Sequence, residues 1–216
     1  MELLLQVGGL EPATDPTLGA LDGRLLALRE QCFGPRVDLV VDCPACGQRL
    51  EAAIELAELR TETPAGEPLE VSSAAGEVRV RFRLPTLADL RSVEAAASVA
   101  VARRTLLQRC VVDARQDGAR IDPASLPEEI VVRVGQAMAA ADRQADVRLG
   151  LTCPDCGHPW DPPFDIAAFL WTEIDARMRR LLVDVHTLAR AYGWSESEVL
   201  GLPPARRKAY LELVLG

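Results

Sequence analysis

Four of the six cysteines in this 216-residue sequence stand in two C-x-x-C pairs that are suited to holding one metal ion. Each pair has the pattern Cys-Pro-x-Cys-Gly, with Cys43 and Cys46 in the first pair and Cys153 and Cys156 in the second. In this pattern the chain turns tightly, two thiolates point toward one ion, and the glycine supplies the positive φ that the turn requires. The sequence therefore predicts a structural Zn²⁺, about one per chain, held by four thiolates in a tetrahedron.

Two other chemistries also use closely spaced cysteines. A thioredoxin-like redox pair begins a helix, whereas each pair here is followed by glycine and a short stretch that predicts the return strand of a hairpin. A zinc deaminase needs an H-x-E sequence, and neither His158 nor His186 lies in one. A closed shell of four thiolates leaves no open position for a substrate, so we expect no catalytic residues. A redox pair, and His158 as a metal ligand, are the alternatives.

The two cysteine pairs belong to an internal repeat. Shifted by 110 residues, segment 37–47 aligns with segment 147–157, and the match continues to Leu56 over Ile166. Alternating apolar residues lead into each turn, which predicts a strand, a zinc knuckle and a second strand in each copy. Two equivalent hairpins, at about 37–57 and 146–163, can pair about a pseudo-twofold axis with one ion between them. A site shared by two chains is the alternative, and the repeat favours one chain.

The elements that must position these hairpins follow from the spacing of apolar residues. Glycine and proline predict an irregular arm over 1–16, and leucines at helical spacing predict a helix over about 17–32, which ends at Gly34-Pro35. Strict alternation predicts a half-buried strand over 77–84. The segment 61–76 before it, rich in threonine, proline, serine and glycine, predicts a loop or a ragged hairpin edge.

Helices are predicted in the middle of the chain. Apolar periodicity predicts a helical run from Thr86 to about Ala114, broken near Ser92 or Ser98. The segment 125–128 has the Ser-x-x-Glu spacing of a capping box, which predicts a helix that continues to about residue 141.

The two cysteines outside the pairs, Cys32 and Cys110, stand on the apolar sides of predicted helices. Isolated cysteines on such faces are usually packed in a protein core. We therefore expect both in the core and neither as a ligand.

The last quarter of the chain predicts a helical segment. Asp165 can cap a helix of about 27 residues that ends at Gly193. A second capping box at 195–198 begins a short helix, and Pro203-Pro204 open the last one. The predicted fold is therefore α+β, with a zinc-knuckle domain over 17–164 and a helical segment over 165–216 packed on it.

The balance of charge disfavours nucleic-acid binding. The chain has 24 basic and 32 acidic residues, a net charge of −8, whereas a protein that binds the phosphate backbone presents a concentrated basic surface. No apolar run approaches the ~20 residues that a membrane span needs, and the N-terminus lacks the regions of a signal peptide. We therefore expect a cytoplasmic protein that binds no nucleic acid, no membrane and no small-molecule substrate. In that reducing compartment the cysteines are expected to bind metal instead of forming disulfides.

Several stretches carry a family resemblance. They are Cys-Phe-Gly-Pro before the first knuckle, Arg-Phe-Arg-Leu-Pro-Thr after the strand, the segment Phe164 to Trp171, and Tyr-Gly-Trp-Ser-Glu at 192–196. With these the chain resembles the zinc-knuckle branch of a baseplate-protein family from contractile-tailed phages, which is carried in gene clusters for phage-tail-like contractile injection systems. The resemblance implies a non-enzymatic structural component or assembly factor of the baseplate, made in the bacterial cytoplasm and able to enter an assembled particle. A zinc-ribbon nucleic-acid or transcription accessory protein is the alternative.

Partner binding is expected at the C-terminal helical segment, because all three tryptophans and both tyrosines lie in it or just before it. Aromatic residues and arginines are the usual anchors of protein interfaces. The predicted contact residues for other baseplate or tail proteins are Trp171, Trp194, Arg206, Arg207 and Tyr210. The alternative is that the aromatic residues pack the long helix onto the domain.

Overall fold

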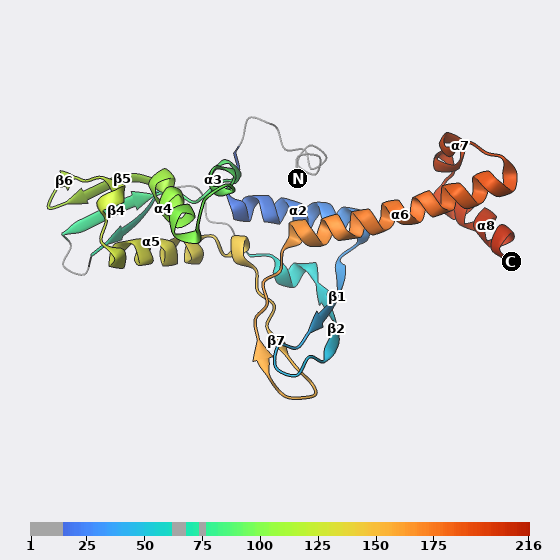
Figure 1. Ribbon diagram of the computed structural model, residues 1–216, viewed down its shortest axis with the longest axis horizontal. Coiled ribbons are helices and arrows are strands. Elements are labelled where there is room, and N and C mark those ends of the chain that lie inside the picture. Colours follow the sequence, from blue (N-terminus) through green and yellow to red (C-terminus); the bar gives the residue numbers. More distant parts are fainter. Residues whose placement is uncertain (1–14, 62–67, 74–76) are drawn as a thin grey trace. The chain divides into compact units, whose positions relative to one another are not determined.

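The computed structural model describes residues 15–61, 68–73 and 77–216. The chain divides into two compact units, one up to Ile166 and one from Ala167. Among the described residues there are seven α-helices and three antiparallel sheets, which confirms the predicted α+β class (Figure 1). Most of the predicted N-terminal arm lies outside the described residues, and the predicted packing of the C-terminal segment on the first domain stays a prediction.

The first unit contains a four-stranded antiparallel sheet in the order β3-β4-β5-β6. Its strands are β3 (Leu69–Ser72), β4 (Val78–Phe82), β5 (Val111–Gln116) and β6 (Ala119–Arg120). The alternation predicted for β4 is confirmed, because its residues are buried and exposed in turn. Strand β3 pairs with β4 at the edge of the sheet, so part of the segment at 61–76 is the edge of a hairpin.

One face of this sheet is covered by helices α4 (Val99–Cys110) and α5 (Glu128–Ala141), with α5 running along the sheet (Figure 1). Apolar side chains from the inward face of β4 and β5 meet those of the two helices in one core. The buried members of this core are Val78, Val80, Phe82, Leu107, Ala114, Leu126, Ile130 and Val134. The opposite face of the sheet is left exposed.

The predicted helical run from Thr86 to Ala114 is wrong in its last part. The break is confirmed, because the run forms α3 (Leu87–Val93) and α4, which Ser98 caps. However, α4 ends at Cys110, and the following residues form β5 because β4 needs a partner strand and two valines favour one. Asp117 and Gly118 both have positive φ, at 49° and 81°, and they form the tight turn from β5 to β6.

The predicted capping box at 125–128 is also wrong, although the helix that it was meant to open is present. Helix α5 begins at Glu128, and no side chain caps it. Ser125 instead ends a short 3₁₀ helix, η2 (Pro123–Ser125), where its hydroxyl donates to the Asp122 carbonyl at 2.7 Å. The Ser125 hydroxyl therefore bonds to the residue before η2 and does not cap α5.

Helix α2 (Leu18–Phe33) is the predicted first helix, and it packs against the 3₁₀ helix η3 (Arg143–Asp146). Thr17 caps its first turn, and Gly34, with a φ of 90°, ends it. The buried Arg29 then fixes the chain that leaves the helix, because its guanidinium donates to the carbonyls of Gly34 and Arg36 at 2.7 and 2.6 Å. Helix α2 thereby holds the start of the first hairpin.

Cys110 is buried as predicted, and burial raises the pKa of its thiol to about 11. The prediction for Cys32 is wrong, because this side chain is exposed. Asp142, just before η3, and Gln144 within it approach Gly19 and Gly23 in the first two turns of α2, whereas Cys32 lies in the last turn, one residue before the helix ends. The apolar spacing in the sequence does not show where the packing partner of a helix stops.

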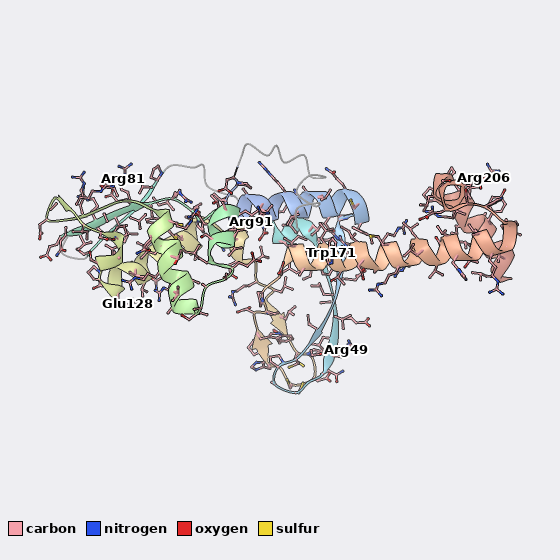
Figure 2. All side chains as sticks on the ribbon, turned by 45° about the horizontal axis from the view of Figure 1, so that its top comes forward. Arg49, Arg81, Arg91, Glu128, Trp171 and Arg206 are labelled. Carbon is pink, nitrogen blue, oxygen red and sulfur yellow. The ribbon has the colours of Figure 1, made fainter. Side chains whose placement is uncertain are left out.

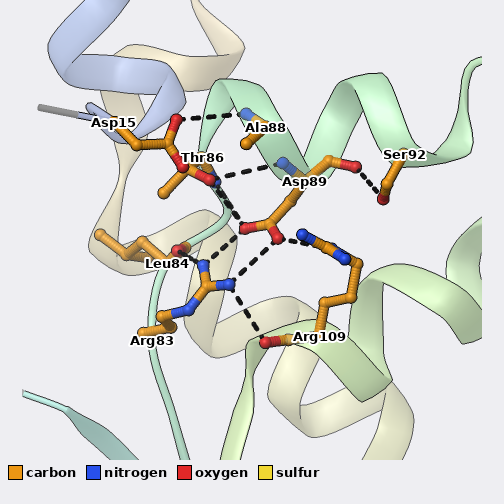
Figure 3. A network of polar contacts seen from close by, with 8 residues as sticks. All are labelled: Asp15, Arg83, Leu84, Thr86, Ala88, Asp89, Ser92 and Arg109. Atoms are coloured by element: carbon orange, nitrogen blue, oxygen red, sulfur yellow. Dashed lines mark hydrogen bonds and ion pairs between the residues drawn. The ribbon is translucent and has the colours of Figure 1, made fainter. Parts of the chain in front are cut away.

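A buried carboxylate ties the end of the sheet to the helices (Figure 3). The Asp89 side chain is only 1% exposed and accepts two hydrogen bonds from Arg83, at 2.5 and 3.0 Å, and one from Arg109 at 2.8 Å. The backbone N–H of Thr86 donates to the same carboxylate at 3.0 Å, so Asp89 and Thr86 form a capping box for α3. Foremost because of the Arg83 hydrogen bonds, the pKa of Asp89 is held far below its ordinary range.

The second unit consists of helices. Helix α6 (Ile166–Tyr192) is followed by α7 (Glu196–Gly201) and α8 (Pro204–Leu215). The predicted capping box of α7 is confirmed: the Glu198 N–H donates to Ser195 Oγ at 3.3 Å, and the Ser195 N–H donates to Glu198 Oε2 at 2.8 Å. The predicted helix boundaries at Gly193 and Pro204 are confirmed as well.

Candidate metal centre

The cysteines lie at the tips of two hairpins in the first unit. In the first hairpin β1 (Arg36–Asp42) pairs with β2 (Arg49–Glu55) along the full length of both strands. In the second hairpin β7 (Leu151–Thr152) and β8 (Pro159–Trp160) pair over two residues. Pro162 continues this register opposite Leu149 and accepts from the Leu149 N–H at 3.0 Å, but proline has no N–H to donate in return, which interrupts the second ladder. The two tips come together in Figure 1.

The two knuckle turns have the same internal hydrogen bonds. In each turn the first cysteine donates its N–H to the carbonyl five residues later, and its carbonyl accepts from the glycine four residues later. These bonds measure 2.8 and 2.8 Å in the first turn and 3.0 and 2.9 Å in the second. Gly47 and Gly157 have φ values of 73° and 71°, the conformation that favours glycine. The burial classes also agree at every position between 41–56 and 151–166. A pseudo-twofold relation between the hairpins stays a prediction.

The four sulfur atoms lie close enough to share one ion. The Sγ atoms of Cys43 and Cys156 are 3.8 Å apart, those of Cys46 and Cys153 are 3.7 Å apart, and all four lie within 4.8 Å of one another. In a tetrahedron with Zn–S bonds of about 2.3 Å the sulfurs are about 3.8 Å apart. A disulfide would need an S–S distance of about 2.05 Å. The cluster therefore fits a tetrahedral metal ion, and its cysteines are not joined in pairs.

The thiols of this cluster do not ionise alike. Burial opposes ionisation of Cys43, but backbone N–H groups of Cys46 and Ala45 donate to its sulfur, and its pKa falls to about 7. For Cys46 the N–H of Gln48 favours the thiolate, yet burial and the neighbouring thiols prevail and raise its pKa to about 12. Four adjacent thiolates repel one another unless a cation offsets their charge. A divalent ion would supply that charge, so its binding would release protons.

Two interactions at the base of the hairpins bring the cysteine pairs together. Gln144, in η3 just before the second hairpin, is 2% exposed. Its side-chain oxygen accepts from the Thr61 N–H at 2.7 Å, and its side-chain nitrogen donates to the Leu59 carbonyl at 3.2 Å. Leu59 ends η1 (Leu56–Leu59), which directly follows the first hairpin. A buried glutamine therefore joins the two hairpin bases, a role that no motif in the sequence indicated.

The comparison with known proteins identifies the family. Residues 20–171 match the family described as T4 bacteriophage base plate protein. The chain belongs to this baseplate family. The matched segment contains both knuckles and the whole four-stranded sheet of the first unit. No curated protein matches the chain, and no solved structure does. The resemblance to a phage baseplate family is confirmed.

Among the described residues, no histidine joins the four-cysteine cluster of the baseplate protein. In the part of the chain that the structure describes, the four cysteines are the one group of metal-ligating side chains near enough to share an ion. His158 stacks on Trp160 instead, with ring centroids 6.5 Å apart. Across the same described residues, no helix combines the length and the apolar character that crossing a membrane requires.

Three aromatic residues of the baseplate protein gather in its second unit, and two of them are predicted contact residues. Trp194 stacks on Tyr192 with centroids 4.8 Å apart, and Tyr210 meets both rings edge-on at 4.9 and 5.6 Å. The guanidinium of Arg206 lies 5.8 Å from the centre of the Tyr210 ring. This cluster fixes the turn after α6 against α8, and Figure 2 labels Arg206 in this helical unit.

The other two predicted contact residues differ in exposure. Trp171 on α6 is 52% exposed. Arg207 on α8 is 7% exposed, and its guanidinium lies 3.6 Å from the Asp184 carboxylate of α6. Arg207 therefore joins two helices of its own unit, which disfavours it as a contact for a partner.

Proposed function

We propose that this protein is a non-enzymatic, zinc-stabilised component or assembly factor of the baseplate of a phage-tail-like contractile injection system. It is made in the bacterial cytoplasm, where thiols stay reduced, and it works by binding other baseplate or tail proteins. The observation that carries the proposal is a closed cluster of four cysteines at tetrahedral spacing within a baseplate-family chain. Such a cluster leaves no coordination position for a substrate, so the ion has a structural role.

The proposed role of the ion follows from what else holds the hairpins. Their bases are joined by Gln144 and by helix α2, but the second hairpin has a short ladder. Bound zinc would hold Cys43 and Cys46 to Cys153 and Cys156 and so fasten the two tips. Because these segments are distant in sequence, removing one thiolate is expected to destabilise both hairpins together.

The proposed partner surface is the C-terminal unit. Trp171, Met178 and Leu182 are 52%, 52% and 61% exposed, and their spacing of seven and four residues places them on one face of α6. Exposed apolar residues that line one helix face favour binding to another protein. The aromatic cluster of Trp194 and Tyr210, with Arg206 beside it, adds the residue types that anchor interfaces.

The test is copurification from cells that assemble the particle, with tagged full-length protein. Leu182→Ser removes an apolar residue from the proposed face, whereas Val183→Ser changes a neighbour of similar exposure (63%) that points about 100° away around the helix. Leu182→Ser, alone or with Trp171→Ser, is expected to lose the copurifying tail proteins, and Val183→Ser is expected to keep them. Equal capture by all variants, with zinc content unchanged, would refute this surface.

A further inference from the structure

The face of the four-stranded sheet that α4 and α5 leave exposed is rich in arginine. The strand register places one set of side chains on this face, and four of its seven members are arginines. The set consists of Glu70, Ser72, Arg79, Arg81, Asp113, Arg115 and Arg120. Figure 2 shows Arg81 on this side and Glu128, at the start of α5, on the opposite side. Its four arginines outnumber its two acids, whereas the whole chain has a net charge of −8.

Three of these arginines form a row across three adjacent strands. Arg79 lies directly opposite Arg115, and Arg115 lies directly opposite Arg120. Like charges directly opposite on neighbouring strands destabilise a sheet. The arrangement therefore lowers the stability of the sheet, so a contribution to folding does not explain it.

The acids on this face offset the row only in part. Arg79 pairs with Glu70 at 3.3 Å, and Arg115 and Arg120 share Asp113 at 2.9 and 3.9 Å. The hydrogen bond from Arg115, and the positive charges of Arg115, Arg120 and Arg81, lower the pKa of Asp113. The three arginine side chains of the row are still 62%, 54% and 76% exposed. Their guanidinium groups therefore keep donors available for a second partner.

We propose that this sheet face is a docking surface for a carboxylate-rich segment of a partner protein. A guanidinium group binds a carboxylate with two parallel hydrogen bonds. Because neighbouring strands lie about 4.8 Å apart, the arginines of the row offer such groups at a regular spacing. The outward set holds no aromatic ring on which a base could stack, which disfavours a single-stranded nucleic acid as the occupant. The surface lies in the first unit and is independent of the C-terminal surface proposed above.

The experiment measures binding of a fluorescent peptide of alternating glutamate and serine to the full-length zinc-loaded protein. Its counterpart with glutamine in place of glutamate, and a single-stranded DNA oligonucleotide, are measured in parallel. The variant Arg79→Gln/Arg115→Gln/Arg120→Gln neutralises the row. Arg24→Gln/Arg49→Gln/Arg91→Gln is the matched control, because it removes the same charge from exposed arginines elsewhere in the first unit.

The glutamate peptide is expected to bind, to bind more weakly as salt rises, and to lose about tenfold or more in affinity in the row variant but not in the control. The row variant is expected to unfold at the same temperature as the unchanged protein or higher, because relief of the like-charge pairs offsets the loss of the exposed ion pairs to Glu70 and Asp113. The proposal is overturned if the glutamate peptide does not bind, if both triple variants weaken it equally, or if the oligonucleotide binds more tightly and depends on the same row.

Discussion

Replacement of Asp89 by asparagine tests whether the buried carboxylate holds the sheet and helices of the first unit together. Asparagine keeps the size of the side chain and one acceptor oxygen, but it removes the charge that faces two guanidinium groups. Those groups belong to Arg83, after β4, and Arg109, at the end of α4. The change therefore isolates the ionic part of the network in Figure 3.

The expected loss of stability depends on the buried carboxylate of Asp89 and on the partly exposed guanidinium groups of Arg83 and Arg109. Breaking a buried ion pair by removing one partner costs about 3–5 kcal/mol. Arg83 and Arg109 are 40% and 44% exposed, so water can solvate them once the carboxylate is gone. We therefore expect Asp89→Asn to lower the free energy of unfolding by about 3 kcal/mol, the lower end of that range. With a denaturant slope of about 2 kcal/mol/M, the urea midpoint falls by about 1.5 M.

The assay is urea unfolding followed by far-UV circular dichroism, since all three tryptophans lie outside the four-stranded sheet. Asp113→Asn is the matched control, because Asp113 also pairs with arginines but lies on the open face, and we expect a loss of about 1 kcal/mol or less. Because the pKa of Asp89 is lowered in the folded protein, its stabilisation is present above pH about 4 and is lost as the pH falls below that value. Equal losses in the two variants, or an acid dependence that Asp89→Asn leaves unchanged, would refute the reasoning.

Two further predictions concern the first turns of α2. Burial raises the pKa of Asp22 to about 6, and the negative charges of Asp165 and Asp142 add to this effect. Ionisation of Asp22 therefore destabilises the folded protein as the pH rises through that value. Asp22→Asn should therefore raise stability by about 1 kcal/mol at pH about 8 and leave it nearly unchanged at pH about 4; thermal melts that show no pH-dependent gain would contradict this. A Cβ at Gly19 would lie 1.8 Å from Asp142 Oδ1, so Gly19→Ala should cost about 2–3 kcal/mol in urea unfolding. Gly23→Ala, whose Cβ has ordinary contacts, should be neutral or stabilising, and equal effects of both changes would refute the steric argument.

The four-cysteine cluster could be predicted from the sequence because its information is local. The turn pattern around Cys43 and Cys153 specifies the direction of each thiolate within five residues. The repeat then indicated that the two turns are alike, although it did not indicate what brings them together. That depends on Gln144 and its hydrogen bonds across the chain, and a single buried glutamine has no local pattern.

The errors in the sequence interpretation have tertiary causes. Val111 and Ala114 continue the apolar spacing of α4, but this segment pairs with the free edge of β4 and forms a strand. The turn signal at Asp117-Gly118 could have indicated the hairpin, since Asp-Gly favours the positive φ values of such turns. The arginine row could not be predicted from spacing alone, because only the register of β4 with β5 sets Arg79 opposite Arg115.

The most direct test of the central claim is the metal content and sulfur coordination of the purified full-length protein. Elemental analysis is expected to give about one zinc per chain, and X-ray absorption is expected to give four sulfur neighbours at about 2.3 Å. Cys43→Ser should lose zinc and destabilise the whole first unit, whereas Cys32→Ser, at an exposed cysteine outside the cluster, should keep both. A protein without zinc, or a zinc ion with fewer than three of these sulfurs, would contradict the account.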